Sequence, residues 1–148
     1  PRENQSTDVL DFVDKYKDVP DVYSQDLLLP RTFIPEVDTQ YFCKMFDINK
    51  MIRKQLGSTN ASASYHSIAF EPIVDNLNII HHIVIYSCRN QQNVEYKDGV
   101  FECFNQHPDC NMITVTWGVG GKGYDFPEEA GLLWGTNESH FVVLEMHY

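Results

Sequence analysis

The sequence predicts an all-β protein, an antiparallel sandwich or barrel, because short apolar segments alternate with turn signals along most of its length. The apolar segments are rich in β-branched and aromatic residues and span residues 41–48, 64–73, 79–88, 112–117 and 141–147. Residues that favour turns, mainly Gly, Asn and Asp, separate them at 57–60, 75–76, 97–99 and 118–123. We find no convincing long helix and no internal repeat, so we expect strands to dominate the fold.

The chain of 148 residues is long enough for one domain with a substantial core. Hydrophobic residues make up 43% and aromatic residues 13% of it, which is typical of a folded protein. Residues 1–30 are polar and acidic, and only residues 8–16 have the spacing of a short amphipathic helix. We expect residues 1–30 to be a linker or arm lying on the domain, following a possible upstream domain, and residues 31–148 to form the β domain.

The formal net charge of −10 argues against nucleic acid as a partner, because the chain could not neutralise a row of phosphates. No apolar run reaches the roughly 20 residues that a membrane-spanning helix needs, so we expect no transmembrane segment. The chain begins at Pro1 without a signal peptide, and we expect a mature or trimmed form.

Cysteine usage and glycosylation motifs favour a secreted protein or one in the lumen of the secretory pathway. The cysteines are even in number, which allows three pairings if all form disulfides: Cys43, Cys88, Cys103 and Cys110. Three Asn-x-Ser motifs are candidate glycosylation sites, at Asn4, Asn60 and Asn137. A zinc site would favour Cys-x2-Cys pairs, which are absent. The spacing Cys103-x3-His107-x2-Cys110 is a weaker candidate for a metal site.

The adjacent residues His81 and His82 lie inside an apolar segment, residues 78–86. A buried imidazole needs a partner, so two of them do not serve the stability of such a strand. His147 closes a second apolar segment, residues 141–147. Three neutral imidazoles form a ligand set for copper or zinc, and we predict a copper site. The structural alternative is that one histidine of the pair is exposed while the other is hydrogen-bonded in the core.

Strand geometry makes this prediction specific. Successive residues of a regular strand point to opposite faces, so His81 and His82 converge on one metal only where the strand begins, bulges or twists. The turn signal at residues 75–78 favours such a place just upstream. His147 must then lie on a neighbouring strand, about 4.8 Å away. His140 is an odd number of residues from His147, so we expect it to face the other side of the sheet.

A longer series of motifs resembles one known family. The series is Asp-Thr-Gln-Tyr-Phe-Cys (38–43), His-His-Ile-Val-Ile-Tyr-x-Cys (81–88), Phe-Glu-Cys (101–103), Cys110, Thr-Trp-Gly-Val-Gly-Gly (116–121), Phe-Pro-Glu-Glu-Ala-Gly-Leu (126–132) and Val-Leu-Glu-Met-His-Tyr (143–148). In this order the motifs resemble the N-terminal copper domain of the type II, ascorbate-dependent copper monooxygenases. That family includes dopamine β-monooxygenase and peptidylglycine α-hydroxylating monooxygenase. The resemblance extends from about residue 29 to residue 148, and residues 126–132 look closer to the dopamine branch.

The resemblance implies a role for each matching residue. It makes three histidines the ligands of the electron-transfer copper: His81, His82 and His147. It also implies two disulfides, Cys43–Cys103 and Cys88–Cys110. The family fold is a jelly-roll-like antiparallel β-sandwich, which agrees with the strand pattern.

The resemblance further implies an activity. In the family, ascorbate reduces the copper, which stores an electron for a second copper. At the second copper, dioxygen is activated and a C–H bond of the substrate is hydroxylated. For this chain we expect a small amine as the substrate. The second site takes two histidines and a methionine on a following domain, which we expect to lie beyond Tyr148. The remaining histidines are scattered and form no His-x-His motif: His66, His107 and His140. We expect an electron-transfer fragment that does not hydroxylate alone. The alternative is a non-catalytic secreted interaction or structural module that keeps the copper-domain sandwich.

Overall fold

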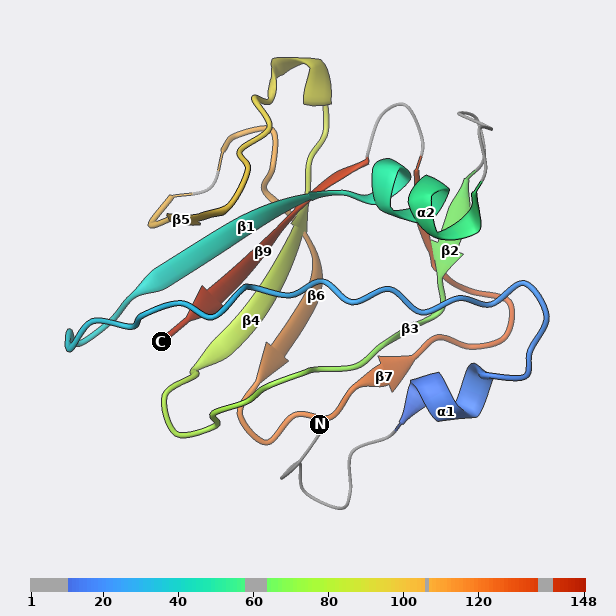
Figure 1. The fold of residues 1–148 in the computed structure, drawn as a ribbon, viewed down its shortest axis with the longest axis horizontal. Helices are drawn as coiled ribbons and strands as arrows, with labels where there is room; N and C mark the ends of the chain where they lie inside the picture. The colour runs from blue at the N-terminus through green and yellow to red at the C-terminus, as the bar shows by residue number, and fades with distance from the viewer. Residues whose placement is uncertain (1–10, 58–63, 106, 136–139) are drawn as a thin grey trace.

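The structure of the protein, a computed structural model, describes residues 11–57, 64–105, 107–135 and 140–148. Antiparallel strands dominate these residues, and the helices are short (Figure 1). The predicted all-β, disulfide-stapled antiparallel sandwich is confirmed. The candidate glycosylation sites lie outside the described residues and stay predictions: Asn4, Asn60 and Asn137.

The main sheet has five antiparallel strands in the order β5-β1-β9-β4-β6 (Figure 1). Their bounds are β5 Val100–Glu102, β1 Tyr41–Asp47, β9 Phe141–His147, β4 His82–Ser87 and β6 Met112–Gly118. The C-terminal strand β9 lies in the middle, hydrogen-bonded to β1 along one edge and to β4 along the other. The register of β9 therefore decides which residues of β1 and β4 lie opposite one another.

Two short strand pairs accompany the main sheet. Their bounds are β2 Tyr65–Ser67 with β8 Leu132–Trp134, and β3 Ala69–Phe70 with β7 Tyr124–Asp125. The predicted strand at 64–73 is therefore divided into β2 and β3. The sequence did not predict β5, β7 and β8, because strands of two or three residues carry too little periodicity to be recognised.

Both faces of the main sheet are buried. One face, together with β8, forms a core that includes Ile83, Ile85, Val142, Leu144 and Trp134. The other face carries a second cluster that includes the four cysteines, Met45, Val94 and Val143. This double burial explains why β4 and β9 are continuous apolar runs rather than alternating ones. Each such aliphatic side chain contributes about 1.5–3 kcal/mol when fully buried.

Helix α2 (Ile48–Leu56) corrects the sequence interpretation, which had no helix there and extended the first strand to Ile48. The Asp47 carboxylate accepts a hydrogen bond from the Lys50 backbone N–H and caps the helix N-terminus. Gly57 ends the helix in the left-handed conformation, with φ 62°. These capping residues were visible in the sequence and would have predicted the helix. Within the described ranges, no helix is long and apolar enough to cross a membrane.

The described part of the N-terminal segment, residues 11–30, contacts the sandwich. Helix α1 (Phe12–Tyr16) lies within the region where the sequence predicts a short helix, and Phe12 is buried. The Phe12 backbone N–H donates to Glu71 beside β3, and the Tyr16 hydroxyl donates to Asp125 of β7 at 3.1 Å. The domain boundary between residues 30 and 31 stays a prediction.

Two disulfides staple the second cluster to the sheet, and they join the same cysteines that the family resemblance pairs. Cys43 of β1 is bonded to Cys103, which follows β5, and Cys88, which follows β4, is bonded to Cys110 before β6. All four cysteines are buried, with exposed fractions between 0% and 5%. The metal site with Cys103, His107 and Cys110 as ligands is therefore wrong, because both cysteines are in separate disulfides.

Removing either disulfide should destabilise the domain, and the longer loop should matter more. The sequence separations are 60 residues for Cys43–Cys103 and 22 for Cys88–Cys110. From loop-closure entropy, the free energy of unfolding should fall by about 4 kcal/mol when Cys43 and Cys103 are both replaced by Ala, and by about 3 kcal/mol when Cys88 and Cys110 are. Urea unfolding followed by tryptophan fluorescence measures both. A smaller loss for Cys43→Ala with Cys103→Ala would contradict the entropic account.

Candidate metal centre

A row of side chains crosses three strands at one end of the main sheet. His147 of β9 is the Cα partner of Tyr41 in β1 and of His82 in β4. Directly opposite residues in an antiparallel sheet project from the same face. The backbone pairing alone therefore places the rings of His82 and His147 side by side.

His81 precedes the regular part of β4, which begins at His82. The Asn76 side chain accepts a hydrogen bond from the Asn78 backbone N–H, which forms the upstream turn, and Ile80 is buried as an anchor. The His81 backbone N–H donates to the His147 carbonyl at 2.7 Å. Because His81 lies outside the regular strand, its side chain turns to the same side as that of His82, as the sequence argument requires.

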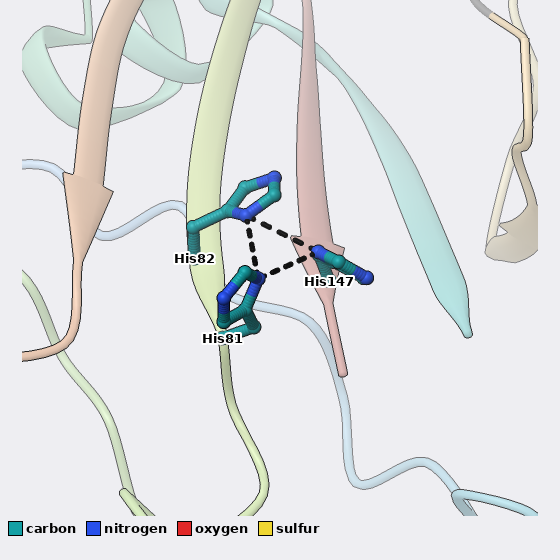
Figure 2. A group of neighbouring side chains, drawn as sticks. All are labelled: His81, His82 and His147. Atoms are coloured by element: carbon teal, nitrogen blue, oxygen red, sulfur yellow. Dashed lines mark hydrogen bonds between the residues drawn. The ribbon is translucent and has the colours of Figure 1, made fainter. Parts of the chain in front are cut away.

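The three rings present the same nitrogen to one another (Figure 2). The Nδ1–Nδ1 distances are 3.1 Å between His81 and His147, 3.3 Å between His81 and His82, and 3.2 Å between His82 and His147. The ring centroids lie 4.6–5.3 Å apart. The structure therefore brings the three predicted residues together from two strands.

This arrangement fits a metal ion. A point equidistant from the three nitrogens lies about 1.9 Å from each, close to the metal–nitrogen bond length of about 2.0–2.1 Å. A neutral imidazole has one N–H and one lone pair, so three Nδ1 atoms cannot satisfy one another by hydrogen bonds alone. A cation between them relieves the repulsion of the lone pairs. Imidazole is a ligand for copper as well as for zinc.

Electrostatics favour the neutral, metal-binding form of His147. Burial lowers the pKa of His147 first, and the neighbouring His82 and His81 lower it further. The charge on Glu145, two residues earlier on the same face, acts in the opposite direction and raises the pKa. Since the net direction is downward, the ring favours the unprotonated state that binds a metal.

Residues at the start of β1 support His147. The ring of Tyr41 stacks on the His147 ring with centroids 4.1 Å apart and an angle of 3° between the planes. Phe104 contacts the Tyr41 ring at 5.7 Å in an edge-on arrangement. The Thr39 hydroxyl lies 2.6 Å from His147 Nε2. The sequence argument did not single out these residues, although Thr39 and Tyr41 lie in one of the motifs, two residues apart and thus on one face.

The histidine cluster lies at the rim of the sandwich and not in its interior. His81 is exposed, while His82 and His147 are half-buried. A cavity of about 860 Å³ lies on the other side of the main sheet, where its lining includes Ile83, Val115 and Met146 but none of the three histidines. The histidine cluster is therefore accessible from solvent.

The remaining histidines lie elsewhere. His66 is exposed on β2, and His107 accepts a hydrogen bond from the Asp109 backbone N–H in the loop before Cys110. His140 precedes β9 at the end of the strand opposite to His147, and its buried Nδ1 has no hydrogen-bond partner among the residues that the structure describes. Among the described residues, the other group of potential ligands is Cys43, Cys103 and Glu145, in which both sulfurs form a disulfide.

The fold and the histidine cluster define an antiparallel β domain with a candidate metal site, and the comparisons assign its family. The family model described as the N-terminal domain of copper type II ascorbate-dependent monooxygenase matches residues 25–148. The chain belongs to this family.

Curated relatives agree with this assignment. DBH-like monooxygenase protein 1 of Homo sapiens is 33% identical, covering 83% of this chain and 20% of the relative. DBH-like monooxygenase protein 2 of Mus musculus is 31% identical, covering 86% of this chain and 20% of the relative. Dopamine beta-hydroxylase of Homo sapiens is 28% identical, covering 86% of this chain and 20% of the relative. The chain thus spans about a fifth of the length of these relatives.

Tyr86, which donates a hydrogen bond to Glu145, gives a prediction in alkaline solution. Burial, followed by the charge and hydrogen bond of Glu145, raises the pKa of Tyr86 from 10.0 to about 12. The neutral hydroxyl therefore contributes stability that is fully present below pH 10 and is lost as the pH rises to about 12.

Ultraviolet titration of tyrosinate should show one group ionising near pH 12 that is missing in Tyr86→Phe. Glu145→Gln should lower the pKa of Tyr86 part of the way toward its ordinary value, because burial remains. An unchanged titration curve in Tyr86→Phe would contradict the assignment.

Proposed function

We propose that the chain is the electron-transfer copper half of an ascorbate-dependent monooxygenase that hydroxylates a C–H bond of a small amine-type substrate. The observation that carries the proposal is the convergence of three imidazole Nδ1 atoms within 3.1–3.3 Å of one another. In this proposal, His81, His82 and His147 hold one copper ion. When bound, the copper supplies one-electron redox chemistry with ascorbate as the reductant.

The donor set suits such a role. Imidazole binds both Cu(I) and Cu(II), whereas thiolate ligands would favour Cu(I). All four cysteines are in disulfides, so no thiolate of this chain competes for the metal. The partial exposure of the cluster gives a soluble reductant access, and the sheet holds two of the ligands in register.

The hydroxylation step needs groups outside this chain. The described residues contain one cluster of three histidines, and the family model covers an N-terminal domain. We therefore place the second copper and the substrate on a following domain of the longer protein. An amine substrate is supported by the relative named dopamine beta-hydroxylase.

The disulfides support an oxidising compartment. Disulfides persist in secreted proteins and in the lumen of the secretory pathway, and are rare in the cytosol. All four cysteines of this chain are paired. We propose that the protein is secreted or retained in that lumen, where the predicted glycosylation of Asn4, Asn60 and Asn137 would also take place.

The copper assignment is tested by elemental analysis of the purified chain. The parent should bind one copper per chain, and His147→Ala should lose most of it because two imidazoles remain. His66→Ala is the matched control, since His66 is exposed on β2 and outside the cluster, and it should keep the full content. Equal copper in the parent and in His147→Ala would sink the ligand assignment. A parent without copper would favour the non-catalytic module.

The proposal that this chain transfers electrons but does not hydroxylate is tested by adding ascorbate to the copper-loaded chain. The paramagnetic Cu(II) signal should disappear on reduction and return with oxygen. No hydroxylated product should form from a phenylethylamine substrate, because the second copper site is not supplied. Turnover by the chain alone, verified against His147→Ala, would contradict this proposal.

A further inference from the structure

We propose that Thr39 is a positioning residue for His147, and that its hydroxyl fixes the ring orientation in which Nδ1 of His147 faces His81 and His82. The inference rests on the proposed copper site and concerns what holds one of its ligands. Its evidence is the 2.6 Å contact between Thr39 Oγ1 and His147 Nε2, the ring nitrogen that points away from the cluster.

Backbone pairing explains why Thr39 reaches this ring. Gln40 and Tyr148 exchange two backbone hydrogen bonds, of 3.1 and 2.9 Å. Tyr41 and His147 are therefore a non-hydrogen-bonded pair, the class in which side chains lie closest. Thr39 is two residues before Tyr41 on the same face, and is the diagonal neighbour of His147. The segment is anchored by Gln40, which is only 6% exposed.

The hydroxyl supplies a constraint that the aromatic stack lacks. Rotating the His147 ring by half a turn about its Cβ–Cγ bond exchanges Nδ1 with Cδ2 and Nε2 with Cε1. Stacking on Tyr41, at 3° between the planes, is almost the same in both orientations. In the rotated ring a carbon would face His81 and His82, and a carbon would face Thr39. The hydrogen bond exists in one orientation only, the one that presents Nδ1 to the cluster.

The direction of the hydrogen bond follows from the lone pairs. His147 Nδ1 faces two other Nδ1 atoms and must offer its lone pair to a metal. The neutral ring then carries its proton on Nε2, which donates to Thr39 Oγ1. Thr39 is exposed, so its own hydroxyl proton can be directed to solvent. A partner on the outer nitrogen that fixes tautomer and ring orientation is a general feature of metal-binding histidines.

His147 differs from the other two histidines in this respect. Within the described ranges, Nε2 of His81 and of His82 has no hydrogen-bond partner, and the hydrogen bonds of these rings are confined to Nδ1. His81 is also exposed. We therefore assign His147 as the fixed ligand around which the other two rings adjust. The partner on its Nε2 is a neutral hydroxyl, which orients the ring without adding negative charge at this position.

The test compares Thr39→Val, which keeps the shape but lacks the hydroxyl, with Thr39→Ser, which keeps the hydroxyl. Thr32→Val is the matched control, because its hydroxyl bonds to the Pro30 carbonyl instead of a histidine. Cu(I) affinity, measured by competition with a chromophoric chelator, should fall about 10–100-fold in Thr39→Val. Thr39→Ser and Thr32→Val should stay close to the parent. Equal affinity of Thr39→Val and Thr39→Ser would overturn the inference even if the parent binds copper.

A second measurement does not depend on copper. Nitrogen-15 NMR of the histidine rings in the metal-free chain should show a His147 Nε2–H that exchanges slowly with solvent in the parent and in Thr39→Ser. This signal should exchange rapidly in Thr39→Val while the far-ultraviolet spectrum stays unchanged. A parent that binds no copper but retains the protected Nε2–H would refute the proposed function and leave the Thr39 contact standing. A parent without that protected proton would refute the contact itself.

Discussion

The pairing of β9 with both β1 and β4 is the constraint on which the rest of this structure depends. A slip of one residue would turn His147 to the opposite face and place Met146 beside Tyr41 and His82, because side chains alternate along a strand. Val142, which is fully buried, opposes such a slip, since it would leave the core between the layers. The geometry of the histidine cluster therefore depends on the packing of the apolar residues of β9, the strand that also carries His147.

The position of the cluster at the rim limits the desolvation free energy that is lost when three imidazoles converge. A polar group moved fully into an apolar interior without a partner loses several kcal/mol. Here His81 keeps contact with water and the other two rings are half-buried, so the penalty is partial. Glu145, two residues before His147 on the same face of β9, is only 6% exposed, and the Tyr86 hydroxyl donates a hydrogen bond to it. The cluster thus combines access from solvent with a buried, hydrogen-bonded carboxyl group near one of its histidines.

On one face of the main sheet, two disulfides hold the covering segment in place. The face of the main sheet that carries Cys43 and Val143 is covered by the mostly irregular segment between Cys88 and Cys110, in which β5 at the sheet edge is the one strand among the described residues. Such a loop has few ladder hydrogen bonds to hold it down, and the two bridges restrict its unfolded conformations. The same bridges remove the thiolates that would otherwise compete with imidazole for a soft metal. The disulfides therefore stabilise the fold and also leave imidazole without competition from thiolates of this chain.

The sequence by itself determined the apolar strands, the three histidines and their likeness to a copper family, because these depend on residue type and local period. Helix α2 was also encoded locally, by Asp47 and Gly57 at its ends, although the apolar strand pattern of residues 41–48 runs into its first residue. Tertiary structure alone decided that the Nδ1 atoms converge and that Thr39 contacts His147. The first result depends on the register between β4 and β9, and the second on the register between β1 and β9; in each case the two strands are far apart in the chain. Register is set by the burial of whole strands, so no spacing of residues within either segment could reveal it.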